Sequence, residues 1–70
     1  KETTIYPNPT TGVFYIRGGA FDRVKVFNTL GDICYEGSES KIDFSKHKKG
    51  VYFIHKITSE HTKVEQLILN

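Results

Sequence analysis

Hydrophobic residues in this chain fall in short runs in which apolar and polar positions alternate, and turn-forming residues separate the runs. Valine, isoleucine, phenylalanine and tyrosine dominate the runs. Groups of Pro, Gly, Asn, Asp and Ser recur about every eight to twelve residues. These turn groups lie at residues 7–9, 18–19, 28–32, 36–38, 45–50 and 59–60. Regular short strands with this spacing predict an all-β domain built as a sandwich or barrel.

The alternation predicts about seven strands. They are expected at residues 3–6, 13–17, 23–28, 33–36, 41–44, 51–58 and 62–69. In the second strand Phe14 and Ile16 share one face, and in the third Val24 and Val26 do so. Gly31 lies in the tight connection between the third and fourth strands, because glycine takes the positive φ that a hairpin turn requires.

The strand at residues 51–58 does not alternate simply. Tyr52 and Ile54 share a face, but strict alternation would next place Lys56 on that face and Ile57 on the opposite one. A bulge at residues 55–56 would return Ile57 to the inner face, whereas without a bulge both faces of the strand would be partly covered. We favour the bulge.

The final segment, residues 62–70, fits two structures. Thr62 and Glu65 match the spacing of a helix capping box. A helix this short is marginal in water, however, because an isolated helix needs about twelve or more residues. Leu67 and Leu69 also alternate with polar and apolar neighbours as in a strand. We therefore predict a strand that forms a hairpin with residues 51–58.

The length and composition of the chain are typical of one small folded domain. The chain has 70 residues, of which 37% are hydrophobic and 26% charged. A domain of this size buries only about 60% of the surface that its unfolded chain exposes, so its core is small. The net charge of +2 is too mild to indicate nucleic-acid binding, and the basic run at 45–49 is interpreted as a solvated loop. The longest apolar runs fall far short of the ~20 residues of a transmembrane helix.

Candidate catalytic and metal-binding residues are few. His47, His55 and His61 are not spaced as metal ligands, and the acidic residues are scattered. The sequence contains no nucleophile elbow and no phosphate-binding glycine loop. The single Cys34 excludes an internal disulfide and is expected to be a small buried hydrophobe. These observations predict a protein that is not an enzyme and needs no cofactor or metal, which leaves a binding or addressing role.

The segment from Tyr6 to Gly12 has a clear physical effect. Pro7 and Pro9 remove two backbone donors and fix φ, so a paired strand cannot continue through them. Asn8 precedes a proline and is therefore pushed towards an extended conformation. A stiff turn is sufficient to explain the segment. We favour a role of this segment in determining the fold over its direct recognition by a partner protein, and both roles remain open.

Four pieces of the sequence together resemble the C-terminal sorting domain of the type IX secretion system, the Por secretion tail of Bacteroidetes. The pieces, in order, are YPNP with a following glycine, VKVFN with a glycine in its turn, IDFS leading to GVYFI, and a short apolar end. The positions that carry the family motif, through recognition or through the fold, are Tyr6, Pro7, Asn8, Pro9, Gly12, Gly31, Gly50, Tyr52, Leu67 and Ile68. The sequence departs from the family pattern where Ile57 arrives one position late and where Gln66 replaces a common lysine.

The resemblance implies an immunoglobulin-like antiparallel β-sandwich at the C-terminus of a larger exported protein, with residues 1–70 as the sorting domain. Such a domain directs its cargo from the periplasm through the type IX translocon to the cell surface or medium. Its implied partners are the translocon, shuttle proteins and a sortase-like peptidase, and it is expected to be a monomer.

A second hypothesis about the function stays open from the residues alone. An accessory β-sandwich could bind carbohydrate or protein for an attached hydrolase or adhesin. It would present a row of exposed aromatic side chains on one face. The candidates for such a row are Tyr15, Phe27, Tyr35 and Tyr52.

Overall fold

The computed structural model describes residues 4–17 and 21–70, and every regular element in these residues is a β-strand. The strands are β1 (Thr4–Tyr6), β2 (Val13–Arg17), β3 (Arg23–Phe27), β4 (Ile33–Gly37), β5 (Lys41–Asp43), β6 (Gly50–Ile57) and β7 (Thr62–Leu69). The seven predicted strands are confirmed within one or two residues at each end, and the final segment is a strand. Thr3 and the turn at 18–19 lie outside the described residues.

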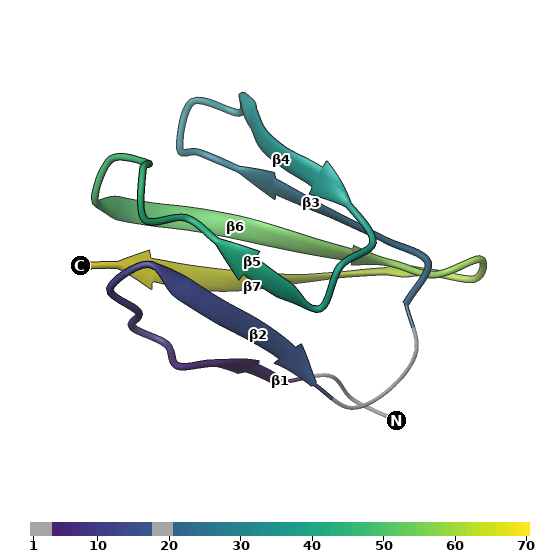
Figure 1. Cartoon of the computed structure of the whole chain (residues 1–70). Helices are drawn as coiled ribbons and strands as arrows, with labels where there is room; N and C mark the ends of the chain where they lie inside the picture. Colours follow the sequence, from purple (N-terminus) through teal and green to yellow (C-terminus); the bar gives the residue numbers. More distant parts are fainter. Residues whose placement is uncertain (1–3, 18–20) are drawn as a thin grey trace.

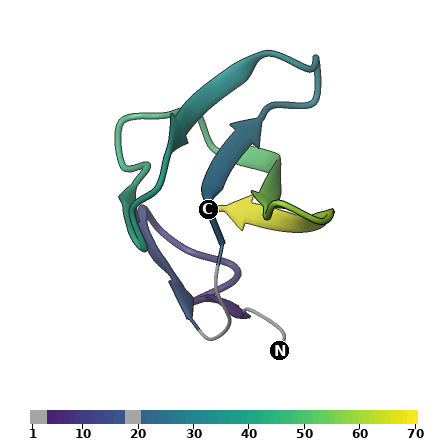
Figure 2. The same ribbon diagram turned by 90° about the vertical axis from the view of Figure 1, so that its right-hand side faces the viewer.

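The strands form two antiparallel sheets that face each other (Figures 1 and 2). One sheet has the order β1-β2-β5, and the other has the order β4-β3-β6-β7. The long β6–β7 hairpin supplies half of the larger sheet, with residue pairs that run from Gly50–Leu69 to Ile57–Thr62. This arrangement confirms the expected all-β sandwich.

The core lies between the sheets and is made by alternate residues of each strand. The buried apolar side chains are Ile5, Phe14, Ile16, Val24, Val26, Ile42, Phe44, Tyr52, Ile54, Leu67 and Leu69. Three aromatic rings join the layers at one end: Phe44 packs edge-on against Phe14 with ring centroids 5.8 Å apart, and against Tyr52 at 5.2 Å. Aromatic pairs in this geometry add to the stabilisation from burial.

The predicted bulge at residues 55–56 is wrong. β6 pairs with β3 and β7 in an unbroken register, so strict alternation holds along the whole strand. Lys56 therefore points inward and is only 6% exposed. Its Nζ lies 2.9 Å from Oε1 of Glu65 on β7. This diagonal cross-strand ion pair allows the amine to be buried, and Ile57 stays half-buried on the outer face.

Glu65→Gln is expected to destabilise the domain by about 1–2 kcal/mol, because Lys56 loses a charged partner at a buried position. Glu36→Gln is the matched control. Glu36 pairs with Arg23 at 2.9 Å, but both side chains are largely exposed, so its loss is expected to cost less than about 1 kcal/mol. Urea denaturation of the two variants measures the difference, and equal costs would contradict the burial argument.

The β3–β4 turn is closed by Asn28. Its side-chain oxygen accepts hydrogen bonds from the backbone N–H groups of Leu30 and Asp32, both at 2.9 Å. Gly31 has a φ of 90°, as the turn prediction requires. Cys34, which follows this turn, is half-buried and packs against the core, so the prediction of a small hydrophobe is confirmed in part.

Candidate functional site

The Pro-Asn-Pro segment connects β1 to β2 and runs along the outer edge of the C-terminal end of β7 (Figure 1). Asn8 bonds to this edge through its side chain. Its Nδ2 donates to the carbonyl of Gln66 at 2.7 Å, and its Oδ1 accepts from the N–H of Ile68 at 3.1 Å. The primary amide thus pairs with β7 much as a peptide group of a neighbouring strand would.

Thr10 continues this pairing with its backbone. Its N–H donates to the carbonyl of Ile68 at 2.9 Å, and its carbonyl accepts from the N–H of Asn70 at 2.8 Å. The Thr10 side chain is buried, with its hydroxyl donating to the carbonyl of Val13 at 2.7 Å. We call these contacts of Asn8 and Thr10 with residues 66–70 the latch.

The latch has two structural effects. It covers the backbone groups at the end of an edge strand, which would otherwise be open to pairing with another chain. It also ties the smaller sheet to the last strand of the larger one, across about sixty positions of sequence. Pro7 and Pro9 fit this path because neither residue supplies a backbone donor. The Tyr6–Pro7 and Asn8–Pro9 peptide bonds are both cis.

Gly12 lies where two backbones approach closely. Its N–H donates to Oγ1 of Thr10 at 3.2 Å, and its carbonyl accepts from the N–H of Phe44 at 2.8 Å. A Cβ at this position would lie 3.0 Å from the Cβ of Ser45 and 3.2 Å from its Cα. Because glycine has no side chain, the chain at residue 12 can pack directly against the β5–β6 connection.

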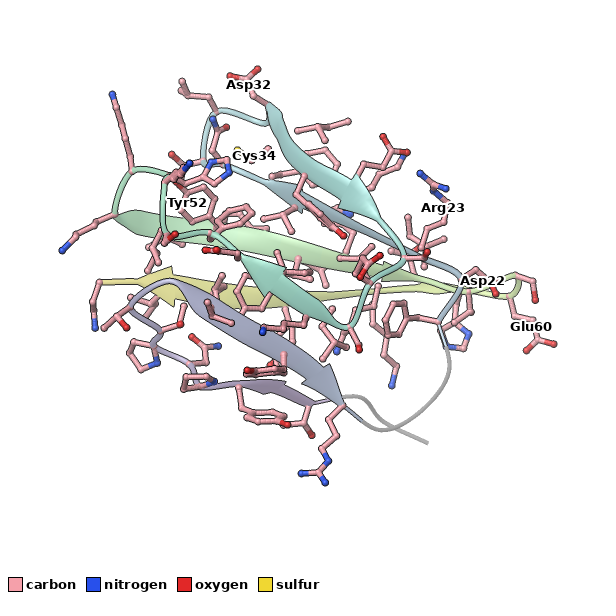
Figure 3. The ribbon with its side chains drawn as sticks, viewed as in Figure 1. Asp22, Arg23, Asp32, Cys34, Tyr52 and Glu60 are labelled. Atoms are coloured by element: carbon pink, nitrogen blue, oxygen red, sulfur yellow. The ribbon has the colours of Figure 1, made fainter. Side chains whose placement is uncertain are left out.

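The β5–β6 connection is held by side-chain contacts. The Asp43 carboxylate accepts hydrogen bonds from the hydroxyl and N–H of Ser45, and these lower the pKa of Asp43. A depressed pKa means that this contribution to stability is present above the ordinary carboxyl pKa and is lost on acidification. His47 stacks on Phe44 with ring centroids 4.0 Å apart. Tyr52, near the start of β6 (labelled in Figure 3), donates its hydroxyl to the carbonyl of Lys48.

The Tyr52 contact has the form of a tyrosine corner, in which a tyrosine early in a sandwich strand bonds to the backbone a few residues upstream. Tyr52→Phe is expected to cost about 1 kcal/mol at neutral pH, because the Lys48 carbonyl loses its donor. Burial raises the pKa of Tyr52, so the folded state holds this proton more tightly than the unfolded state does. This contribution of Tyr52 to the stability of the fold is present below the ordinary tyrosine pKa. It is lost as the pH rises through the pKa that Tyr52 has in the folded state.

Urea denaturation of the wild type and Tyr52→Phe across neutral and alkaline pH measures both effects. The difference between the two proteins should narrow above about pH 10, where the unfolded tyrosine ionises. Tyr15→Phe is the control, because Tyr15 is 37% exposed on the outer face of the smaller sheet. A cost at Tyr15 equal to that at Tyr52 would contradict the assignment.

The structure brings some of the predicted motif residues together and leaves others apart. Asn8 meets Ile68 in the latch, while Gly12 and Tyr52 both hold the β5–β6 connection. Leu67 is fully buried in the core, whereas Ile68 beside it is 37% exposed. Gly50 begins β6 with a φ of 146°, and Gly31 lies in a separate turn. Tyr6 is exposed and stacks on Tyr15, with ring centroids 5.5 Å apart.

Two features of the structure were missed by the sequence prediction. Thr10 lies within the segment from Tyr6 to Gly12, but only the position of β7 shows which backbone it pairs with. Lys56 and Glu65 were hidden by the preference for a bulge. Strict alternation after Tyr52 and Ile54 was the signal that would have placed Lys56 inside.

The described part of the chain offers little catalytic geometry. Within residues 4–17 and 21–70, no three His, Cys, Asp or Glu side chains gather in a way that could hold a metal ion. His55 lies against Phe27 with ring centroids 4.4 Å apart, and His47 is stacked in the aromatic cluster. Among the same residues, no helix has the length and apolarity needed to cross a membrane.

The model of a protein family described as the secretion system C-terminal sorting domain matches residues 4–70. The chain belongs to this family. The match extends from β1 to β7 and so includes both sides of the latch. A comparison with curated proteins finds no match. The sorting domain is a C-terminal signal for type IX secretion, which implies export to the cell surface or medium.

The accessory-module alternative is not favoured for this sorting domain. Its four candidate aromatic residues do not form a row on one face. Tyr52 is 5% exposed in the core, and Tyr35 is half-buried against it. Tyr15 lies on the outer face of the smaller sheet and Phe27 on that of the larger sheet.

Proposed function

We propose that residues 1–70 form one sorting domain of a larger exported protein and act as a folded tag for that protein. The cargo passes through the periplasm, and the tag is recognised there by shuttle proteins and the type IX translocon. A sortase-like peptidase then acts on the tagged protein. In this proposal the tag is a monomer and catalyses no reaction itself.

The observation that supports this proposal best is the latch. It joins the motif near the start of the domain to the last strand, so the motif and the C-terminal end are parts of one folded unit. A signal that a partner recognises as an unfolded linear peptide would need no such contact. We propose that Pro7, Asn8, Pro9, Gly12, Gly31, Gly50, Tyr52 and Leu67 act through the fold. Tyr6 and Ile68, which are exposed, are available to a partner.

The proposal is tested by fusing residues 1–70 behind a periplasmic reporter in a bacterium with a type IX system. We expect the reporter at the cell surface or in the medium, and its retention in the periplasm in a strain that lacks the translocon. The reporter without the domain is the control. Equal periplasmic retention with and without the domain would contradict the proposal.

A further inference from the structure

The outer face of the four-stranded sheet is unusually apolar over β6 and β7. The residues that point away from the core on these strands are Val51, Phe53, His55, Ile57, Thr62, Val64, Gln66 and Ile68. None of these positions carries Asp, Glu, Lys or Arg, although 26% of the chain is charged. The outer face of an antiparallel sheet that meets only water normally carries polar and charged residues.

The apolar surface continues across the sheet to its other edge. Ile33 on β4 pairs with Phe27 on β3, which in turn pairs with Phe53 on β6. Val64 is 56% exposed, Ile33 52%, Ile68 37% and Phe53 36%. We call the surface formed by Phe27, Ile33, Val51, Phe53, Val64 and Ile68 the outer apolar face.

The core does not account for this surface. The residues of the outer apolar face point away from the other sheet. The core between the two sheets is filled by the alternate positions of the same strands. The outer face of the smaller sheet differs, because Arg17, Lys41 and Asp43 surround its two exposed tyrosines. A contiguous exposed apolar surface of this kind marks an interaction site on a soluble domain.

The two ends of the outer apolar face differ in charge. At one end, Lys48 and Lys49 line a depression of about 270 Å³ together with Leu30 and Val51. At the other end, Arg23 and Lys25 pair with the carboxylate of Glu36, at 2.9 and 4.0 Å, and the acidic residues Asp22 and Glu60 lie at the same end (Figure 3). Figure 3 shows Arg23 and Tyr52, a lining residue of the depression, towards opposite ends of the sheet.

We propose that the outer apolar face docks a protein of the export apparatus that presents an apolar patch with carboxylates at the end that meets Lys48 and Lys49. The proposal rests on the proposed sorting function and names the surface through which it acts. Apolar contact supplies the affinity, and the charges of Lys48 and Lys49 at one end orient the partner.

The test uses the exported fusion with Phe53→Thr and Ile68→Thr combined. Threonine keeps the preference for a strand while removing most of the apolar contact. The matched control is Val13→Thr with Tyr15→Thr, which changes two residues on the outer face of the opposite sheet, where Tyr15 is 37% exposed, as Ile68 is. We expect the first variant to lower export by about tenfold and the control to leave it unchanged.

A charge-reversal pair provides a second variant in case the first is poorly folded. Lys48→Glu with Lys49→Glu is expected to lower export by about tenfold, because it places like charges against the partner's carboxylates. Lys41→Glu with Lys46→Glu changes the net charge equally on other parts of the surface and is expected to leave export unchanged. Thermal unfolding of each purified variant confirms that the domain is folded.

The outcomes separate the two proposals. If the wild-type fusion is retained in the periplasm, the sorting function fails and the docking proposal falls with it. If the wild-type fusion is exported and both outer-face variants are exported equally well, the docking proposal alone is overturned. A dimer in sedimentation that Phe53→Thr with Ile68→Thr abolishes would assign the face to a second copy. Binding to vesicles of phosphatidylcholine and phosphatidylglycerol that the same variant abolishes would assign it to a membrane surface.

Discussion

Deletion of residues 67–70 is expected to unfold the domain and abolish export. Leu67 and Leu69 are 0% and 3% exposed, and removal of each buried leucine costs roughly 2–5 kcal/mol. The deletion also removes the side of the latch that pairs with Thr10. The total stability of a domain this small is about 3–5 kcal/mol, so the loss exceeds what is available. Circular dichroism and thermal melting measure this loss of folded structure.

Two point variants of adjacent residues serve as the control for this deletion. Leu67→Ser alters the core, whereas Ile68→Ser alters the outer face and keeps the backbone N–H that Asn8 binds. We expect Leu67→Ser to unfold or nearly unfold the domain and Ile68→Ser to remain folded. A deletion variant that keeps a cooperative melting transition would show that β7 is dispensable for the fold.

Phe44→Ala is expected to cost about 3–5 kcal/mol and so to leave little or no folded protein. Phe44 is 1% exposed and packs against Phe14, His47 and Tyr52. Its loss leaves a cavity between the two sheets and removes the ring against which the tyrosine corner packs. Because β5 is short, little else holds its end against the larger sheet.

Phe53→Ala is the matched control for Phe44→Ala, because it removes the same side chain from a position that is 36% exposed. We expect a smaller cost at Phe53, since part of its surface is already in water. Urea denaturation of both variants gives the comparison. A cost at Phe44 no larger than that at Phe53 would contradict the assignment of Phe44 to the centre of the core.

The strands were predictable because one face of each is buried. In β2 and β3 the buried pairs Phe14–Ile16 and Val24–Val26 recur at every second position, and this local period is visible in the sequence. The same period also placed the last strand correctly once an isolated helix was judged too short. The family resemblance added what periodicity could not, because the order of several motifs identifies a family even where each motif is a common turn.

The errors and omissions arose where a residue depends on a distant partner. Lys56 looked too polar for the core, and only the alignment of β6 with β7 brings Glu65 within reach of its amine. The order of the strands within each sheet was likewise not fixed by local pattern. The role of Asn8 was open for the same reason, because a proline-flanked asparagine indicates a turn but not which backbone its amide binds.

The contact of Asn8 with β7 fixes the last strand in place. This role of Asn8 is tested most directly by the amide hydrogen exchange of Ile68, measured by NMR in the wild type and in Asn8→Ala. We expect slow exchange in the wild type and exchange faster by about five- to tenfold in the variant, as the loss of a bond of about 1 kcal/mol implies. The amide of Ile54 in the core should change much less. Equal exchange of Ile68 in both proteins would contradict the claim.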